Sequence, residues 1–170
     1  MAGSVQIHGT GQLLTLSRRL RAAGGPRLQQ NFARRIRRTA EPLHRDLTST
    51  ITRLPLRSAG RGARRRGGPS PTQRPFRATL AGAVRISVRT GTNPGARVFF
   101  DPALLPPDIS AGVLYQLDAG RLRHPVFGNR KRWANQTTPA GWWGRTVNRH
   151  TPRMRAEVER VLTDVRRQLE

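Results

Sequence analysis

Hydrophobic residues recur every three or four positions over a long stretch in the first third of the chain. From Arg27 to Leu54 this spacing predicts one amphipathic helix, roughly 40 Å long if it is continuous. Pro42 lies inside the stretch and removes one backbone hydrogen bond, so we expect a kink near Arg38 to Pro42. The apolar stripe consists of Leu28, Phe32, Ile36, Ala40, Leu43, Leu47, Ile51 and Leu54.

The same helical spacing appears in two shorter segments. Leucines at helical intervals predict a helix from Gly11 to Ala23, which Gly24-Gly25-Pro26 ends. A second helix is predicted from Pro152 to Leu169, with Thr151 as N-cap and Pro152 at its first position. The stripe of this last helix consists of Met154, Val158, Val161, Leu162, Val165 and Leu169.

In the middle of the chain the period changes to two. Alternation predicts three strands, Phe76 to Leu80, Ala83 to Thr90 and Ala96 to Phe100, separated by turn residues rich in glycine. They form an antiparallel meander with one face exposed to solvent. A short element from Ala111 to Ala119 is predicted to be helical or strand-like.

Residues 121–150 are rich in Gly, Pro and Asn and hold all three tryptophans, and they predict an aromatic loop. Large rings on a loop serve as anchors, either in the chain's own core or on a neighbouring subunit. We therefore expect these residues either to cap the chain's own sheet or to form an interface between subunits. The candidate interface residues are His124, Pro125, Phe127, Asn129, Arg130, Trp133, Gln136, Trp142 and Trp143.

Together the patterns predict an α+β fold with long N-terminal amphipathic helices, a small antiparallel sheet of about three to four strands, an aromatic loop and a C-terminal helix. The 170 residues predict a single domain. Its regions are helical residues 11–54, a basic Arg/Gly/Pro segment 57–75, a β-meander with a short element 76–120, the aromatic loop 121–150 and the final helix 151–170.

The charge narrows the choice of partners. The net charge is +23, and all but one of the 32 basic residues are arginine, the exception being Lys131. So basic a chain requires an acidic partner, which can be nucleic acid or an acidic protein face. No apolar run approaches the length of a membrane span. A solvated basic face is the commoner outcome for charges on an amphipathic helix, and docking on an acidic partner is the functional alternative. The candidate docking or DNA-proximal residues are Arg34, Arg35, Arg37, Arg38, Arg61, Arg64, Arg65 and Arg66.

No group of residues predicts catalysis, a metal site or a cofactor site. The four histidines, one of them His124, lie in different elements without the spacing of metal ligands. The chain has no cysteine, which excludes disulfides and thiol chemistry. Three central carboxylates, Asp101, Asp108 and Asp118, have no spacing that suggests an acid–base pair, and we expect them to pair with arginines.

One block resembles a known family. The run Gly120-x-x-Arg-His-Pro-Val-Phe-Gly-Asn-Arg-x-x-Trp133-x-x-Gln136, followed by Pro139-x-Gly-Trp-Trp143 and a basic helix, is similar to the neck proteins of long-tailed double-stranded DNA phages, in the type found in actinobacterial phages. The resemblance covers residues 113–170. Elsewhere only the organisation agrees, and the basic segment 57–75 departs from the family.

The resemblance implies a virion structural protein at the head–tail junction, assembled in the host cytoplasm. It would form a ring, commonly of six copies, that completes the tail and lets DNA pass through its channel. Such a protein is not an enzyme and needs no cofactor. The alternatives are a tail-terminator ring and a basic nucleic-acid-binding protein of ribosomal or nucleoid type.

A charge estimate limits how much of the arginine can contact DNA. A duplex carries one charge per ~1.7 Å of axis, so a ring roughly 40 Å tall encloses about 24 phosphates. Six copies at +23 bring about 138 positive charges. We therefore expect most arginines to dock on acidic neighbouring proteins, with non-specific DNA contact by a minority.

Overall fold

The structure is a computed structural model that describes residues 4–8, 11, 14–15, 18–19, 22, 26–58, 75–90, 95–126 and 129–169. It has the α+β fold that the sequence predicts. Where the length predicts one domain, the contacts form two compact units, neither of which is a continuous segment. Unit 1 consists mainly of Asp46–Val84 and Phe100–Thr146, and unit 2 of Ser4–Arg45, Arg85–Phe99 and Val147–Glu170.

The predicted long helix is confirmed as α2, Pro26–Arg53, which continues through Pro42. Its stripe is buried at every position from Phe32 to Leu54. Because proline lacks an N–H, the Arg38 carbonyl loses its usual donor there. Thr39 is a buried polar residue of the helix, and its hydroxyl donates to the Ile36 carbonyl at 2.7 Å. The predicted kink stays a prediction.

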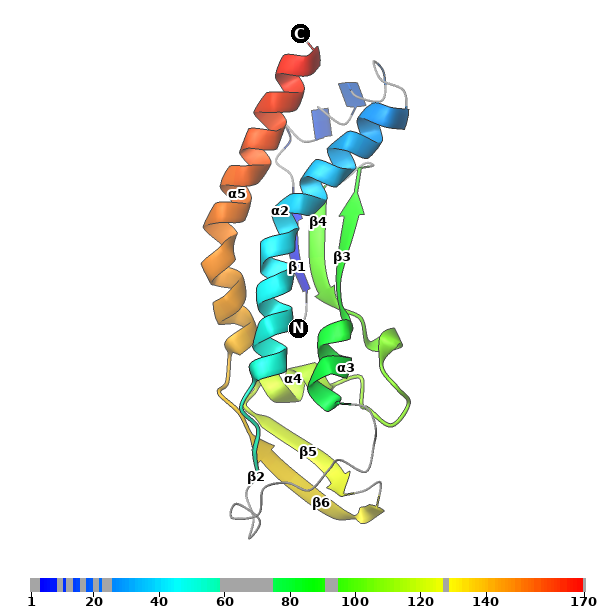
Figure 1. The fold of residues 1–170 in the computed structure, drawn as a ribbon, viewed down its shortest axis with the longest axis vertical. Coiled ribbons are helices and arrows are strands. Elements are labelled where there is room, and N and C mark those ends of the chain that lie inside the picture. Colours follow the sequence, from blue (N-terminus) through cyan, green and yellow to red (C-terminus); the bar gives the residue numbers. More distant parts are fainter. Residues whose placement is uncertain are drawn as a thin grey trace. The chain divides into compact units, whose positions relative to one another are not determined.

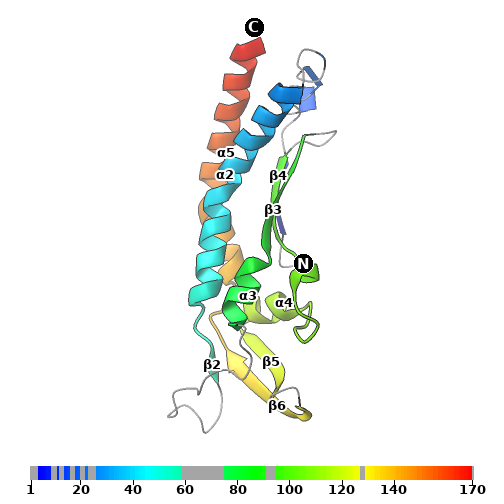
Figure 2. The same cartoon turned by 45° about the vertical axis from the view of Figure 1, so that its right-hand side comes forward.

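Unit 2 has two layers, a helix pair and a sheet (Figures 1 and 2). Its sheet has the strand order β1–β4–β3, with β1 Ser4–His8, β3 Val84–Arg89 and β4 Gly95–Phe100. Two of the three predicted strands are thus confirmed. The alternation on β4 is strict, with Ala96, Val98 and Phe100 buried. Helix α2 packs beside α5, Trp142–Leu169, and an ion pair joins Arg35 to Asp164 at 3.6 Å.

Unit 1 is built on a second sheet, with the strand order β2–β6–β5. Its strands are β2 Arg57–Ser58, β5 Arg121–Val126 and β6 Asn129–Thr137. Helix α4, Val113–Asp118, contacts β5 and buries Val113, Leu114 and Leu117. Helix α3, Phe76–Gly82, and the 3-10 turn η1, Pro102–Leu104, complete the unit.

The strand predicted from Phe76 to Leu80 is wrong, because this segment is helix α3. Phe76 and Leu80 are separated by four residues, a spacing that fits one face of a helix as well as one face of a strand. Pro75 precedes the helix, and its carbonyl accepts the Thr79 N–H at 3.0 Å and the Thr79 hydroxyl at 3.2 Å. Burial of Leu80 and Ala81 then favours the helix.

The aromatic loop predicted for residues 121–150 is also wrong. Half of its residues form the strands of the antiparallel hairpin β5–β6, and residues 142–150 are the beginning of α5. Pro125 suggested a loop, but β5 is an edge strand, where a missing N–H breaks no ladder on the open side. Strand β6 is mostly polar, so it shows no hydrophobic alternation, and its backbone pairing with β5 and β2 creates the strand.

The C-terminal helix begins at Trp142, earlier than the predicted start at Pro152. Thr151 is not an N-cap, because its hydroxyl donates to the Val147 carbonyl at 2.9 Å, one turn back along the helix. The buried face continues toward the start of α5 through Thr146, whose hydroxyl donates to the Trp142 carbonyl at 2.9 Å. A polar residue at that position interrupts the hydrophobic pattern and hides the true start.

Several predictions lie outside the described residues. Of the predicted helix Gly11–Ala23, only six scattered positions are described, each of them helical. The arginines at 61, 64, 65 and 66 and the ring of Phe127 are not described, and of Asn129 and Arg130 only the backbone is.

Candidate interaction site

The β2–β6–β5 sheet of unit 1 has two different faces. In the antiparallel pair, Leu122 lies opposite Gln136 and Arg123 lies opposite Asn135. Because side chains alternate along a strand, these two pairs belong to opposite faces. Leu122 is buried, whereas Arg123 and Asn135 are exposed. We call the exposed side the Trp133 face; its members in the paired register are Arg57, Arg121, Arg123, Pro125, Trp133, Asn135 and Thr137.

Trp133 is the centre of this face. Its side chain is 48% exposed. Arg123, its diagonal neighbour across the strand pair, places its guanidinium carbon 4.7 Å from the centre of the indole ring. The Arg123 backbone N–H donates to the Gln116 side chain of α4 at 3.1 Å. The stacked pair is therefore held both by its ring contact and by the position of β5.

The strands of both sheets carry no carboxylate. The sequence has no acidic residue between Asp46 and Asp101, nor between Asp118 and Glu157. In unit 2 a second stacked pair has the same chemistry, with the Arg97 guanidinium 4.8 Å from the centre of the Phe99 ring. Positive charge on the strands is therefore not balanced by acidic side chains of the same sheet.

Of the other predicted interface residues of the hairpin, Pro125 shares the face of Trp133, whereas His124 and Gln136 lie on the inner side. His124 is half-buried on the inner side of β5, and its Nδ1 lies 3.1 Å from the Pro125 carbonyl oxygen. Gln136 is half-buried on the same side, opposite Leu122 and Ser58. Pro125 lies opposite Trp133 and is half-buried.

Trp142 and Trp143 belong to the core of unit 1. Each is 4% exposed, and their rings meet edge to face with centroids 5.8 Å apart. Both rings are thus buried within the chain itself. Trp133, in contrast, is exposed, so it is the tryptophan for which we still predict a contact with another subunit.

Asp118 caps the beginning of α5. Its carboxylate oxygen accepts the Trp143 N–H at 2.9 Å, and its backbone carbonyl accepts the Gly141 N–H at 2.7 Å. The first N–H groups of a helix have no partner inside the helix, and a nearby negative charge is favourable there. We predicted that Asp118 pairs with an arginine, whereas in the structure its carboxylate caps a helix.

Replacing Asp118 by alanine is expected to lower the free energy of unfolding by about 1 kcal/mol, because a helix cap is lost. Asp118→Asn keeps an oxygen acceptor, so its loss of unfolding free energy should be less than half of the loss in Asp118→Ala. Urea unfolding followed by circular dichroism measures both. Equal losses in the two variants would contradict the capping role.

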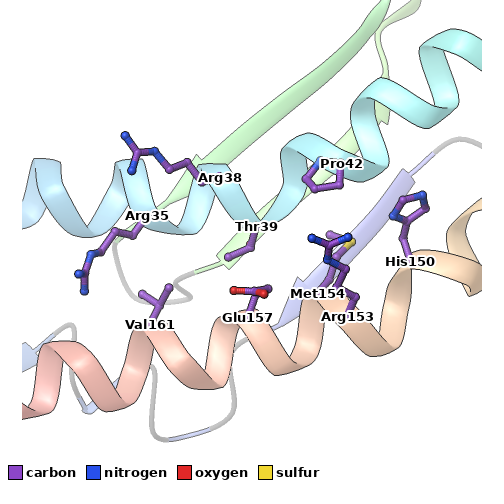
Figure 3. A pocket seen from close by; sticks show the side chains of 9 residues that line it. All are labelled: Arg35, Arg38, Thr39, Pro42, His150, Arg153, Met154, Glu157 and Val161. Carbon is purple, nitrogen blue, oxygen red and sulfur yellow. The ribbon is translucent and has the colours of Figure 1, made fainter.

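The predicted basic residues of α2 have different environments. Arg35 pairs with Asp164 inside unit 2, and Arg34 donates to the Asn31 side chain. Arg37 and Arg38 are exposed. Beside them α2 and α5 border a cavity of about 330 Å³, which Figure 3 shows. The Glu157 carboxylate lies between the helices, while Arg38 points away from α5.

Sequence reasoning missed Arg57, Arg121 and Arg123 as members of one surface. They come from strands β2 and β5, and only the register of both strands with β6 brings them together. The hairpin had one detectable signal, the alternation of Leu122 with arginines, but Pro125 obscured it.

Among the residues described, His, Asp and Glu side chains nowhere form a group of three able to hold a metal ion. None of the described helices combines the length and apolar character needed to cross a bilayer. In comparisons with known proteins, no family model matches the chain, and no significant match is found among curated proteins or among solved structures.

Proposed function

We propose that this chain is a structural protein of the neck of a long-tailed double-stranded DNA phage, where copies form a ring that joins the head to the tail. The residues that carry the resemblance, Gly120 to Trp143, fold as the hairpin β5–β6 and the start of α5. The observation that supports assembly most is Trp133, a half-exposed indole on a face of cations. Exposed tryptophan and arginine are the residue types that dominate binding energy in protein interfaces.

In this proposal the chain is not an enzyme, and its partners are its own copies, acidic neck or tail proteins, and the DNA of the channel by non-specific contact. It functions in the virion at the head–tail junction after assembly in the host cytoplasm. A tail-terminator ring would use the same surfaces. A nucleic-acid-binding protein is the second candidate, and the cationic strands without carboxylates favour it.

Trp133→Ala is expected to abolish ring formation while leaving the fold intact, since the indole is half-exposed. Negative-stain electron microscopy and light scattering of the purified full chain measure assembly, and circular dichroism measures folding. Tyr115→Ala, which removes another exposed ring of unit 1, is the matched control. If the unmodified chain and both variants form oligomeric rings equally well, the role of Trp133 is refuted.

The proposal itself is tested in purified particles. Mass spectrometry should detect the chain there, and antibody labelling should place it at the junction of head and tail. Absence from the particles would overturn the proposed function.

A further inference from the structure

We propose that the Trp133 face binds an acidic segment of a partner protein, with Trp133 as the apolar anchor and Arg123 as the carboxylate clamp. The inference deepens the proposed function and relies on it for the partner being a neighbouring protein of the particle. The occupant is a segment that combines carboxylates with a large apolar side chain.

The contact between Arg123 and Trp133 orders the arginine before a partner binds. The Arg123 guanidinium carbon lies 4.7 Å from the centre of the indole ring, and this contact restricts the side chain. A planar fork that is already ordered loses less conformational freedom when it grips a carboxylate in two hydrogen bonds. About half of the Trp133 surface is exposed to solvent, where it can make an apolar contact.

The charge of the face specifies the chemistry of the partner. The neighbouring positions Arg57 and Arg121 are exposed cations on the flanking strands. Asp118 is the acidic residue nearest to β5 in the sequence, and its carboxylate already accepts the Trp143 N–H. The three strands of this sheet supply no carboxylate of their own, and we propose that those on the Trp133 face come from another chain.

An acidic protein fits the face better than a nucleic acid does. Sheets that bind single strands offer two or three aromatic rings on which successive bases stack. In the described part of the Trp133 face there is one such ring, and Arg123 already covers one side of it. Contacts to duplex phosphates need cations but no exposed indole. A tryptophan beside an arginine is instead typical of a protein hot spot.

Fluorescence anisotropy with the full chain and a labelled synthetic peptide tests the proposal. The peptide alternates glutamate with leucine, and two further peptides replace either glutamate by glutamine or leucine by serine. Arg123→Gln is compared with Arg155→Gln, which removes one exposed cation from α5. We expect Arg123→Gln to weaken binding of the Glu/Leu peptide about tenfold or more, and Arg155→Gln to weaken it less than about twofold.

Trp133→Ala tests the apolar anchor. This variant should bind the Glu/Leu peptide about tenfold more weakly or worse, and its affinity for the Glu/Ser peptide should be nearly unchanged. Equal losses for Arg123→Gln and Arg155→Gln would overturn the proposal, because binding would then depend on total charge alone. A larger loss of single-stranded or duplex DNA binding than of peptide binding in Trp133→Ala would assign the face to nucleic acid and also overturn it.

These outcomes are separate from those that test the proposed function. Peptide binding localised to Trp133 and Arg123 would support the surface even if the chain were absent from phage particles. Conversely, if the chain is found at the head–tail junction but its variants bind the peptides equally well, the proposed function stands and the proposed binding surface is refuted.

Discussion

Replacing Trp142 by alanine is expected to lower the free energy of unfolding by about 3–5 kcal/mol, the usual cost of removing a large buried ring. The side chain is almost completely buried in unit 1 and packs edge to face against Trp143. Its indole N–H is buried without a hydrogen-bond partner, which offsets part of the packing gain. Trp142→Phe removes this N–H while it keeps an aromatic ring, so it should cost clearly less than alanine.

Urea unfolding followed by far-ultraviolet circular dichroism measures these losses without relying on tryptophan emission. Trp133→Ala is the matched control, and we expect it to change the free energy of unfolding by less than about 1 kcal/mol, as for most exposed positions. Comparable losses at Trp133 and Trp142 would contradict the division of the tryptophans into one surface anchor and a buried pair.

Leu43→Ala should produce the second large loss, about 2–5 kcal/mol, this time in unit 2. Leu43 has no exposed surface and lies on the apolar stripe of α2. Truncation leaves a cavity that a helix cannot close by moving one side chain. The change is measured by the same urea titration.

Arg37→Ala is the control for Leu43→Ala, because it truncates an exposed side chain of the same helix. Alanine is a better helix former than arginine, so little change is expected. A loss below about 1 kcal/mol in Leu43→Ala would show that the α2 stripe contributes less packing than its burial implies.

Where the hydrophobic period is long and uninterrupted, the sequence predicted the fold correctly. The α2 stripe repeats along a helix of 28 residues, and no strand can satisfy that spacing, so its helix and its buried face follow directly. The alternation on β4 was equally informative. Short segments were ambiguous, as α3 shows, because seven residues can fit either period.

The candidate site was predicted only in part. The sequence identified Trp133 as an anchor because of its residue type and its surroundings, but it grouped Trp133 with Trp142 and Trp143. Burial separates them, and burial depends on what packs against each ring. Arg123 became a site residue only through the diagonal contact across β5 and β6.

The sequence by itself determined the amphipathic α2, the alternating β3 and β4, the α+β class and a surplus of arginine without carboxylates on the strands. These depend on residue type and spacing along one stretch of chain. The tertiary structure alone decided the register of β5 with β6, the start of α5 at Trp142 under the Asp118 cap, and the exposure of Trp133. Each of these results from pairing or packing between different elements, whose energies the pattern of one segment does not record.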